Sequence, residues 1–314
     1  MPDTNQKVVI TGGAGLVGQN LLVLLQSAGW NNITVIDKHR ANMELLRRIH
    51  PQVTTIEADL AEPGPWQDAL IDCEMLVQAH AQIGGLDYGP FEANNITATQ
   101  RVLEAAQQGS EPFVVHLSSS VVNSLADDFY TRSKTRQEQI VLADRLPHCV
   151  LRPTLMFGWF DRKHLGWLSR FMSKVPVFPI PGNGKYLRQP LYVQDFCQVI
   201  VRCMERRPAG EIYDISGLQR VDYIDLIKAL KKANGAKAKI TKIPYGLFRV
   251  LLKIYALVDR DPPFTVAQLE ALVTPDVFDV IDWPGQFDVE ATSLDDALHA
   301  TFNDPRYSEL ELAF

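Results

Sequence analysis

Residues 7–18, Lys-Val-Val-Ile-Thr-Gly-Gly-Ala-Gly-Leu-Val-Gly, decide the fold of this chain. The apolar run Val8-Val9-Ile10 is typical of a buried parallel strand. Gly12, Gly15 and Gly18 follow it with the spacing G-x-x-G-x-x-G, and a leucine-rich helical pattern begins at once. Glycines at such a junction permit a tight turn and the close approach of a pyrophosphate to the helix N-terminus. The stretch therefore predicts a dinucleotide-binding loop between a strand and a helix.

Further apolar segments with strand character occur at intervals along the first half of the chain. They are residues 32–37, 53–60, 75–79 and 113–117. Helical patterns separate them, which predicts an α/β fold, a Rossmann-type doubly wound parallel sheet with its ligand at the carboxyl ends of the strands. The strand–helix rhythm breaks near Arg152, so we expect a smaller C-terminal α/β substrate-binding region. The predicted dinucleotide-binding domain is 1–152 plus about 189–215, and the substrate-binding region is about 153–188 and 216–314.

Two acidic residues end the second and third predicted strands. Asp37 lies 19 positions beyond Gly18, where the ribose hydroxyls of a dinucleotide are expected. A carboxylate there accepts hydrogen bonds from the diol and repels a 2′-phosphate, which favours NAD. The neighbouring cations Lys38 and Arg40 leave NADP open. Asp37 could instead cap the next helix, and Asp59 could receive the adenine amino group or cap a turn.

Tyr130 and Lys134 are four residues apart, 11 residues after Ser119 in the run Ser118–Ser120. On a helix this spacing puts the phenol and the ammonium on one face. A nearby positive charge is expected to lower the tyrosine pKa, and a serine hydroxyl could bond a substrate oxygen while the tyrosine moves the proton. The alternative is that Lys134 is solvated and pairs with Glu138.

Composition and charge exclude several classes of function. The formal net charge of −6 and a pI near 5.7 argue against nucleic acid as the main partner. Four cysteines show no metal-ligand spacing, so we expect no metal site and buried free thiols in a cytoplasmic protein. We expect no membrane span. Residues 245–258 form an apolar helix that could be core, subunit interface or a membrane-facing surface, and the residues from about 303 resemble a loosely held tail.

The chain resembles the extended short-chain dehydrogenase/reductase family, in its NAD-dependent epimerase/dehydratase branch. The motifs that carry the resemblance extend over nearly the whole length. They are Thr11-Gly12-x-x-Gly15-x-x-Gly18, Asp37, Asp59-Leu60, residues 95–99, Ser118-Ser119, Tyr130-x-x-x-Lys134, Arg152-Pro153, Gly182-Asn183-Gly184, Arg188 and Tyr192-Val193-x-Asp195.

The resemblance implies a role for each matching residue. Tyr130 would be the general acid/base, Lys134 its neighbour and a ribose contact, and Ser119 the catalytic hydroxyl, with Ser120 as the alternative. Asn95 would brace the helix that carries Tyr130. The implied cofactor contacts are Gly12, Gly15, Leu16, Val17, Asp37, Lys38, Asp59, Leu60, Ala79, His80, Ala81, Asn95, Tyr130, Lys134, Pro153 and Thr154. The implied substrate contacts are Ser119, Ser120, Asn123 and Arg188.

The resemblance also implies a reaction, that of an NAD-dependent epimerase or 4-ketoreductase acting on a nucleotide-diphosphate sugar. It further implies a homodimer. Arg188 would grip the diphosphate, although it could be an ordinary surface residue. Dehydratase activity is disfavoured because Ser120 and Val121 stand where the family's dehydratases carry an Asp-Glu pair. Alternatives are an NAD(P)-dependent reductase of a non-sugar carbonyl such as a hydroxysteroid-like ketone, and a non-catalytic NAD-binding scaffold.

Overall fold

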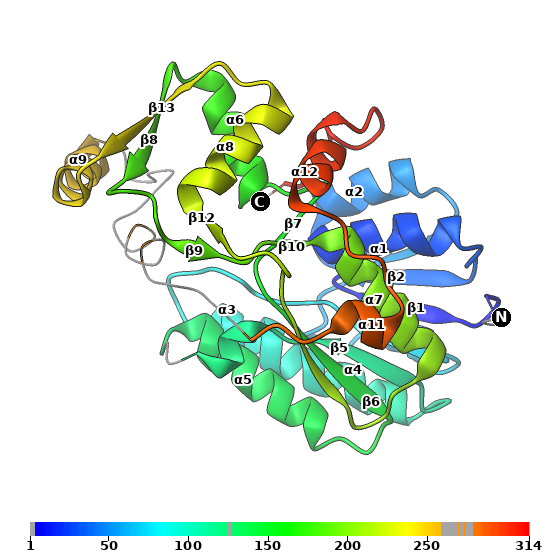
Figure 1. The fold of residues 1–314 in the computed structure, drawn as a ribbon. Coiled ribbons are helices and arrows are strands. Elements are labelled where there is room, and N and C mark those ends of the chain that lie inside the picture. Colours follow the sequence, from blue (N-terminus) through cyan, green and yellow to red (C-terminus); the bar gives the residue numbers. More distant parts are fainter. Residues whose placement is uncertain (1–3, 125–126, 259–268, 270–272, 274–278, 314) are drawn as a thin grey trace.

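A seven-stranded parallel sheet forms the centre of the molecule (Figure 1). The computed structural model describes residues 4–124, 127–258, 269, 273 and 279–313. The strand order is β11-β6-β5-β4-β1-β2-β3. The strands are β1 (Val8–Thr11), β2 (Ile33–Asp37), β3 (Thr54–Glu57), β4 (Met75–Gln78), β5 (Phe113–Leu117), β6 (His148–Pro153) and β11 (Ile212–Ile215). The Rossmann-type doubly wound fold is therefore confirmed.

Helices cover both faces of this sheet, which explains the continuous apolar runs of its strands. Val8 and Ile10 point into one core and Val9 into the other, because successive side chains of a strand alternate. The first core is shared with α1 (Leu16–Ser27), α2 (Arg40–Ile49) and α7 (Val193–Arg206). The second is shared with η1 (Pro65–Leu70), α4 (Ala98–Gln107) and α5 (Phe129–Leu142).

The short elements at the carboxyl ends of the strands shape the edge of the sheet where the site lies. The π-helix η2 (Glu92–Thr97) joins α3 (Gly89–Phe91) to α4, and the 3-10 turn η3 (Ser120–Asn123) follows β5. The short strands β7 (Met156–Phe157) and β10 (Leu191–Tyr192) pair in parallel beyond β6.

A separate apolar core holds the C-terminal lobe together, around residues such as Phe157, Met172, Ile227 and Leu298. The lobe contains α6 (Leu165–Lys174), α8 (Tyr223–Asn234), α12 (Leu294–Asn303) and the parallel pair β8 (Val177–Pro181) and β13 (Lys239–Ile243). The antiparallel pair β9 (Leu187–Arg188) and β12 (Val221–Asp222) lies between this lobe and the sheet, and α9 (Tyr245–Val258) lies at its outer end (Figure 1).

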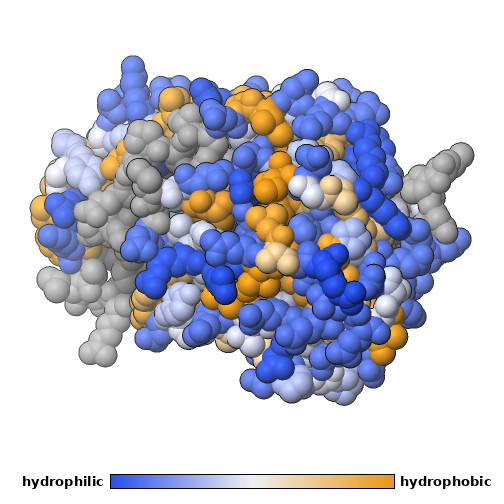
Figure 2. All heavy atoms as spheres, turned by 90° about the horizontal axis from the view of Figure 1, so that it is seen from below, coloured by the Kyte–Doolittle hydropathy of each residue, from blue (hydrophilic) through white to orange (hydrophobic). Residues whose placement is uncertain are grey.

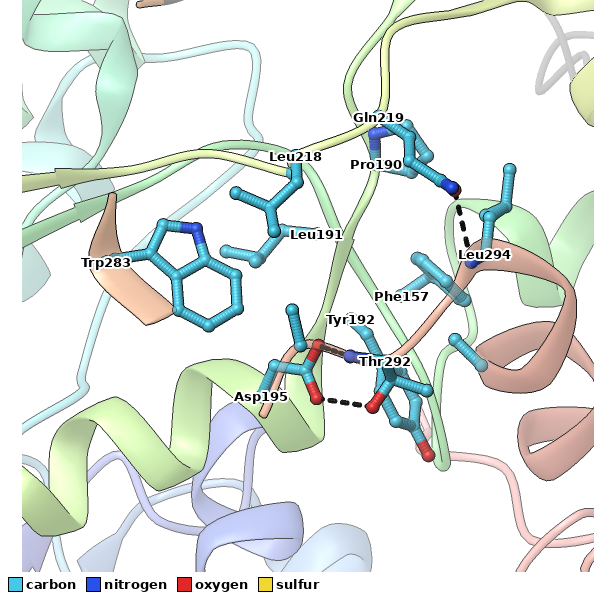
Figure 3. Close-up of a pocket in the computed structure, with 13 residues that line it drawn as sticks. Phe157, Pro190, Leu191, Tyr192, Asp195, Leu218, Gln219, Trp283, Thr292 and Leu294 are labelled. Carbon is cyan, nitrogen blue, oxygen red and sulfur yellow. Dashed lines mark hydrogen bonds between the residues drawn. The ribbon is translucent and has the colours of Figure 1, made fainter. Parts of the chain in front are cut away.

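A small cavity of about 30 Å³ lies where the C-terminal lobe meets the sheet domain, and hydrogen bonds around it join the two (Figure 3). Asp195, in the first turn of α7, accepts hydrogen bonds from the Thr292 backbone N–H at 2.9 Å and the Thr292 hydroxyl at 2.7 Å. Burial raises the pKa of this carboxyl group. The indole of Trp283, in α11 (Trp283–Phe287), donates to the Ser216 carbonyl oxygen at 2.9 Å. Asp195 is therefore a structural anchor for the segment that leads into α12.

The expectation of a loosely held tail from about residue 303 is wrong. The Tyr307 ring packs against Trp159, with ring centroids 4.8 Å apart. Glu311 pairs with Arg170 at 2.8 Å. The Ala313 N–H donates to the Asn42 side chain at 2.7 Å, so the end of the chain is attached to α2. The sequence suggested a free tail because these partners are distant along the chain.

Candidate active site and cofactor cleft

The turn after β1 has no room for a side chain at Gly12. Gly12 has a φ of +70°, in the left-handed region that favours glycine, and a Cβ atom there would lie 2.4 Å from the His80 Cα. A Cβ on Gly18 would lie 2.3 Å from the Gly13 carbonyl oxygen, so that glycine lets α1 pack closely on the loop. The N-terminus of α1, with Gly15 as its N-cap, thereby comes close to the cleft described next.

A cleft of about 580 Å³ lies beyond the carboxyl ends of β1, β2 and β4. Most predicted cofactor contacts line it: Gly12, Gly15, Leu16, Asp37, Lys38, Asp59, Leu60, Ala79, His80 and Ala81. The cleft has the size of a small-molecule site and offers a helix N-terminus to a pyrophosphate and a carboxylate to a ribose. These residues therefore fit a dinucleotide. In the described part of the chain, no cluster of side chains is arranged to hold a metal ion.

The carboxylates at the ribose end have defined partners. Asp37 accepts from the Ala14 N–H at 3.1 Å and the His39 N–H at 2.9 Å. His39 is the N-cap of α2, so the alternative that Asp37 caps this helix is wrong. Lys38 donates to Asp59 at 2.9 Å, and its charge is therefore partly neutralised within the cleft wall. This arrangement favours NAD over a 2′-phosphorylated cofactor.

His80 is a neutral structural residue that also forms part of the cleft wall. Its Nδ1 lies 2.7 Å from the Thr11 hydroxyl, and its Nε2 lies 3.0 Å from the Thr99 hydroxyl. Burial, with a smaller contribution from the charge of Lys134, lowers the His80 pKa to about 3. The imidazole thus fixes the end of β4 against α4 and holds no positive charge at neutral pH.

Tyr130 lies in the first turn of α5, which begins after the N-cap Asp128. Ser119, and not Ser120, acts on the Tyr130 phenol as a hydrogen-bonding neighbour that lowers its pKa. The Tyr130 pKa is raised, because burial outweighs the lowering effect of Ser119 and Asp128 adds a further raising effect. The prediction that Lys134 lowers this pKa is therefore wrong: desolvation of the phenolate is the larger effect here.

Lys134 is only 1% exposed, so the alternative of a solvated surface lysine is wrong. Its ammonium group donates to the Leu117 carbonyl oxygen at 2.8 Å and to the Gln137 side chain at 2.5 Å. Burial lowers the Lys134 pKa to about 7, against a smaller raising effect from Glu138. Lys134 thus ties α5 to the end of β5, directly before the serine run.

Buried polar contacts fix α5 further. Glu138 pairs with Arg152 through two hydrogen bonds, of 3.0 and 2.5 Å, and also accepts from the Ser118 hydroxyl. Asn95, from η2, donates to the Ser133 hydroxyl at 2.9 Å and binds the backbone of Gln82 through both its side-chain atoms. The helix that carries Tyr130 is therefore held from the adjacent strands and from η2.

Other predicted residues are not among those that line the cleft. The cleft lining described here does not include Val17, Asn95, Tyr130, Lys134, Pro153 or Thr154. The Thr154 hydroxyl donates to the Gln189 carbonyl oxygen at 3.1 Å and so joins the segment after β6 to the segment after β9. Asn123 donates to Asp214 at 2.9 Å. Arg188 is partly exposed on β9, opposite Val221 of β12.

The far wall of the cleft was missed by sequence reasoning. It consists of residues 160–164 with Leu312. Other lining residues that the motifs did not indicate include Asn42, Gln82 and Asn94. Arg162 and Lys163 make this wall cationic. Residues 160–164 carry no motif, and they reach the cleft only because the chain returns there after β7.

Comparisons with known proteins agree with this geometry. Residues 8–216 match the model of the NAD dependent epimerase/dehydratase family. The chain belongs to this family. It is an enzyme, and its cofactor is NAD.

Relatives of this family member differ in the reactions their names describe. A dTDP-glucose 4,6-dehydratase of Actinoplanes sp. is 25% identical over 266 residues, covering 74% of this chain and 83% of that protein. A 4-hydroxy-2-methyl-3-oxo-4-farnesyl-3,4-dihydroquinoline-1-oxide ketoreductase of Stigmatella aurantiaca is also 25% identical, covering 77% and 78%. The UDP-glucuronic acid 4-epimerase of Bacillus cereus, solved with NAD, has the same fold, with a TM-score of 0.70, 21% identity and coverage of 95% and 98%.

Proposed function

We propose that this enzyme is an epimerase or a 4-ketoreductase acting on a nucleotide-diphosphate sugar. The observation that carries the proposal is that Ser119, just beyond the end of β5, is the serine that acts on the buried Tyr130 phenol, in a chain that also has the cofactor cleft. NAD, when bound, accepts hydride from a carbinol carbon or returns it to a carbonyl carbon. The chain itself must then bind the substrate oxygen and move its proton.

Each catalytic side chain has one task in this proposal. Ser119 orients the substrate hydroxyl or carbonyl oxygen, and Tyr130 takes or gives its proton. Lys134 is held by the Leu117 carbonyl oxygen and the Gln137 side chain at the end of β5, directly before the serine run. The raised Tyr130 pKa keeps the phenol protonated at neutral pH, the form that donates a proton when a carbonyl is reduced.

The sugar part of the proposal rests on Arg188 and on the relatives. Arg188 is partly exposed on β9, between the sheet and the C-terminal lobe, and a guanidinium can bond two phosphate oxygens at once. A structural neighbour was solved with UDP-glucuronic acid and NAD. Ser120 and Asn123 lie in the turn after Ser119 and are proposed to face the sugar. A homodimer, a cytoplasmic location and the division into two domains remain predictions.

A reductase of a non-sugar carbonyl is the second candidate. A relative named as a ketoreductase of a farnesylated quinoline oxide matches this chain as well as the sugar dehydratase does. Such a substrate has no diphosphate for Arg188 to bind. A variant at Arg188 therefore distinguishes a nucleotide-sugar enzyme from a reductase of an uncharged ketone. Replacement of Arg188 with Met should raise the KM for a nucleotide sugar and leave the KM for an uncharged ketone unchanged.

The direct test is a substrate panel. Purified enzyme with NAD or NADH is incubated with UDP- and dTDP-hexoses, their 4-keto forms, and a non-phosphorylated long-chain ketone, and products are followed by NMR. The proposal expects a changed configuration at one sugar carbon or reduction of the 4-keto sugar. Reduction of the long-chain ketone, with no conversion of any nucleotide sugar, would contradict it.

A further inference from the structure

Helix α9 exposes an apolar stripe. Leu247, Val250, Leu251 and Ile254 are 51%, 51%, 47% and 54% exposed, and they follow the spacing i, i+3, i+4, i+7 of a single helix face. Phe248 and Leu252, on a different face, are more buried. Scattered surface leucines are ordinary, but a continuous stripe on one helix marks a surface that another apolar body covers.

The sequence around this helix is unusually basic. Residues 226–258, here called the basic segment, contain eight lysine or arginine residues and no aspartate or glutamate. Because the whole chain carries −6, a segment of +8 leaves −14 for the other residues. The cationic members are Lys228, Lys231, Lys232, Lys237, Lys239, Lys242, Arg249 and Lys253. Positive charge is therefore concentrated in one part of an otherwise acidic protein.

The charges and the stripe lie in the same lobe. Lys239 and Lys242 are exposed on β13, which leads directly into α9, and Arg249 and Lys253 are exposed on α9 itself. Lys228 and Lys232, on α8, form ion pairs with Asp225 and Asp295. Figure 1 places α8, β13 and α9 together at one end of the molecule, and the same end of Figure 2 shows hydrophobic atoms among hydrophilic ones.

We infer that α9 and the basic segment dock this protein on a membrane surface that contains anionic lipids. An apolar stripe that enters the acyl boundary, combined with lysines that reach lipid phosphates, is the composition of interfacial helices. A span is not involved, because no helix in the described residues is long and apolar enough to cross a bilayer. A soluble protein partner or a second copy of the chain would explain the stripe but not the clustered positive charge.

The test is sedimentation of the full chain with phosphatidylcholine vesicles, with and without phosphatidylglycerol. We expect binding to the anionic vesicles, weakened by salt. The double variant Leu251→Glu/Ile254→Glu should lose this binding, and Lys239→Glu should weaken it about fivefold or more. Leu86→Glu, at a side chain 95% exposed elsewhere, and Arg48→Glu, on α2, are the matched controls and should bind as the wild type does.

The same experiment can overturn the inference. Failure of the wild type to sediment with anionic vesicles, or equal losses in the α9 and control variants, would contradict it. So would a wild-type dimer that the α9 double variant converts to a monomer in analytical ultracentrifugation, because a second copy would then cover the stripe. Unchanged turnover of a soluble substrate shows that the variants are folded. Leu247→Ser/Val250→Ser serves if the glutamate variant does not fold.

Discussion

Helices α5 and α9 are both 14 residues long, and their side chains are distributed in opposite ways. The sequence of α5 is polar, yet Thr131, Ser133, Lys134, Gln137 and Glu138 are buried in it. The sequence of α9 is apolar, yet four of its large hydrophobic residues are about half exposed. Each helix departs from the usual rule that apolar side chains face inward and charged ones face water.

The contrast between α5 and α9 indicates which surfaces of the molecule have a functional role. Burial of polar groups is unfavourable unless each finds a partner, and the buried lysine, glutamate and serine of α5 have partners that fix the helix carrying Tyr130. Exposure of an apolar stripe is unfavourable in water, which favours contact of α9 with another apolar surface. The two helices therefore mark an internal catalytic wall and an external docking surface.

The largest effect on stability is expected from breaking the ion pair that fixes α5. Glu138→Gln leaves the half-buried Arg152 without its main counter-charge, so the free energy of unfolding should fall by roughly 3 kcal/mol. Urea denaturation measures this. Glu44→Gln, which removes an exposed pair with Arg40, is the control and should change stability by less than about 0.5 kcal/mol. Equal changes in both variants would show that α5 does not depend on this pair.

A smaller, pH-dependent effect is expected from Lys134. Its pKa is about 7 in the folded protein, against an ordinary 10.5, so between these values the unfolded chain holds a proton that the folded protein has released. The wild type should therefore gain stability, relative to Lys134→Met, as the pH rises from 7 toward 10. Urea denaturation at several pH values measures the difference, with Lys237→Met as the exposed control. If the free energy of unfolding changed with pH in the same way for wild type and Lys134→Met, the lowered pKa of the buried Lys134 would be contradicted.

The smallest effect is expected from α9. Leu251→Ser removes a side chain that is 47% exposed, so the free energy of unfolding should stay within about 0.5 kcal/mol of the wild type and turnover of a soluble substrate should not change. Thermal denaturation and steady-state kinetics check this, with Leu230→Ser, fully buried in α8, as the contrasting variant that loses stability. A large loss in Leu251→Ser would show that α9 belongs to the core.

Much of the fold could be predicted because its signals are local. The apolar run before Gly12 and the glycine spacing follow from the geometry of a single strand, turn and helix. The spacing of Tyr130 and Lys134 likewise depends on one helix. The strand ending at Leu117 placed Ser119 at the correct edge of the sheet, beside Tyr130.

The remainder depends on packing between distant segments. The cationic wall at 160–164 and the contact of Leu312 with the cleft form only when the chain returns to the sheet. The prediction that the Tyr130 pKa is lowered was wrong because the spacing of Tyr130 and Lys134 indicates a neighbouring charge and does not indicate the burial of the phenol. The apolar pattern of α9 could not distinguish core from surface, since periodicity shows that a face is apolar but not what it faces.

The central claim is that α5 presents Tyr130 as the proton donor and acceptor of an NAD-dependent reaction. The most direct measurement compares wild type and Tyr130→Phe, each with the cofactor and the substrate found in the panel, by NMR measurement of product formation and by calorimetric NAD binding. Turnover by Tyr130→Phe should fall about 10²- to 10⁴-fold with unchanged NAD affinity, while Tyr213→Phe should behave as the wild type. Undiminished turnover by Tyr130→Phe would contradict it.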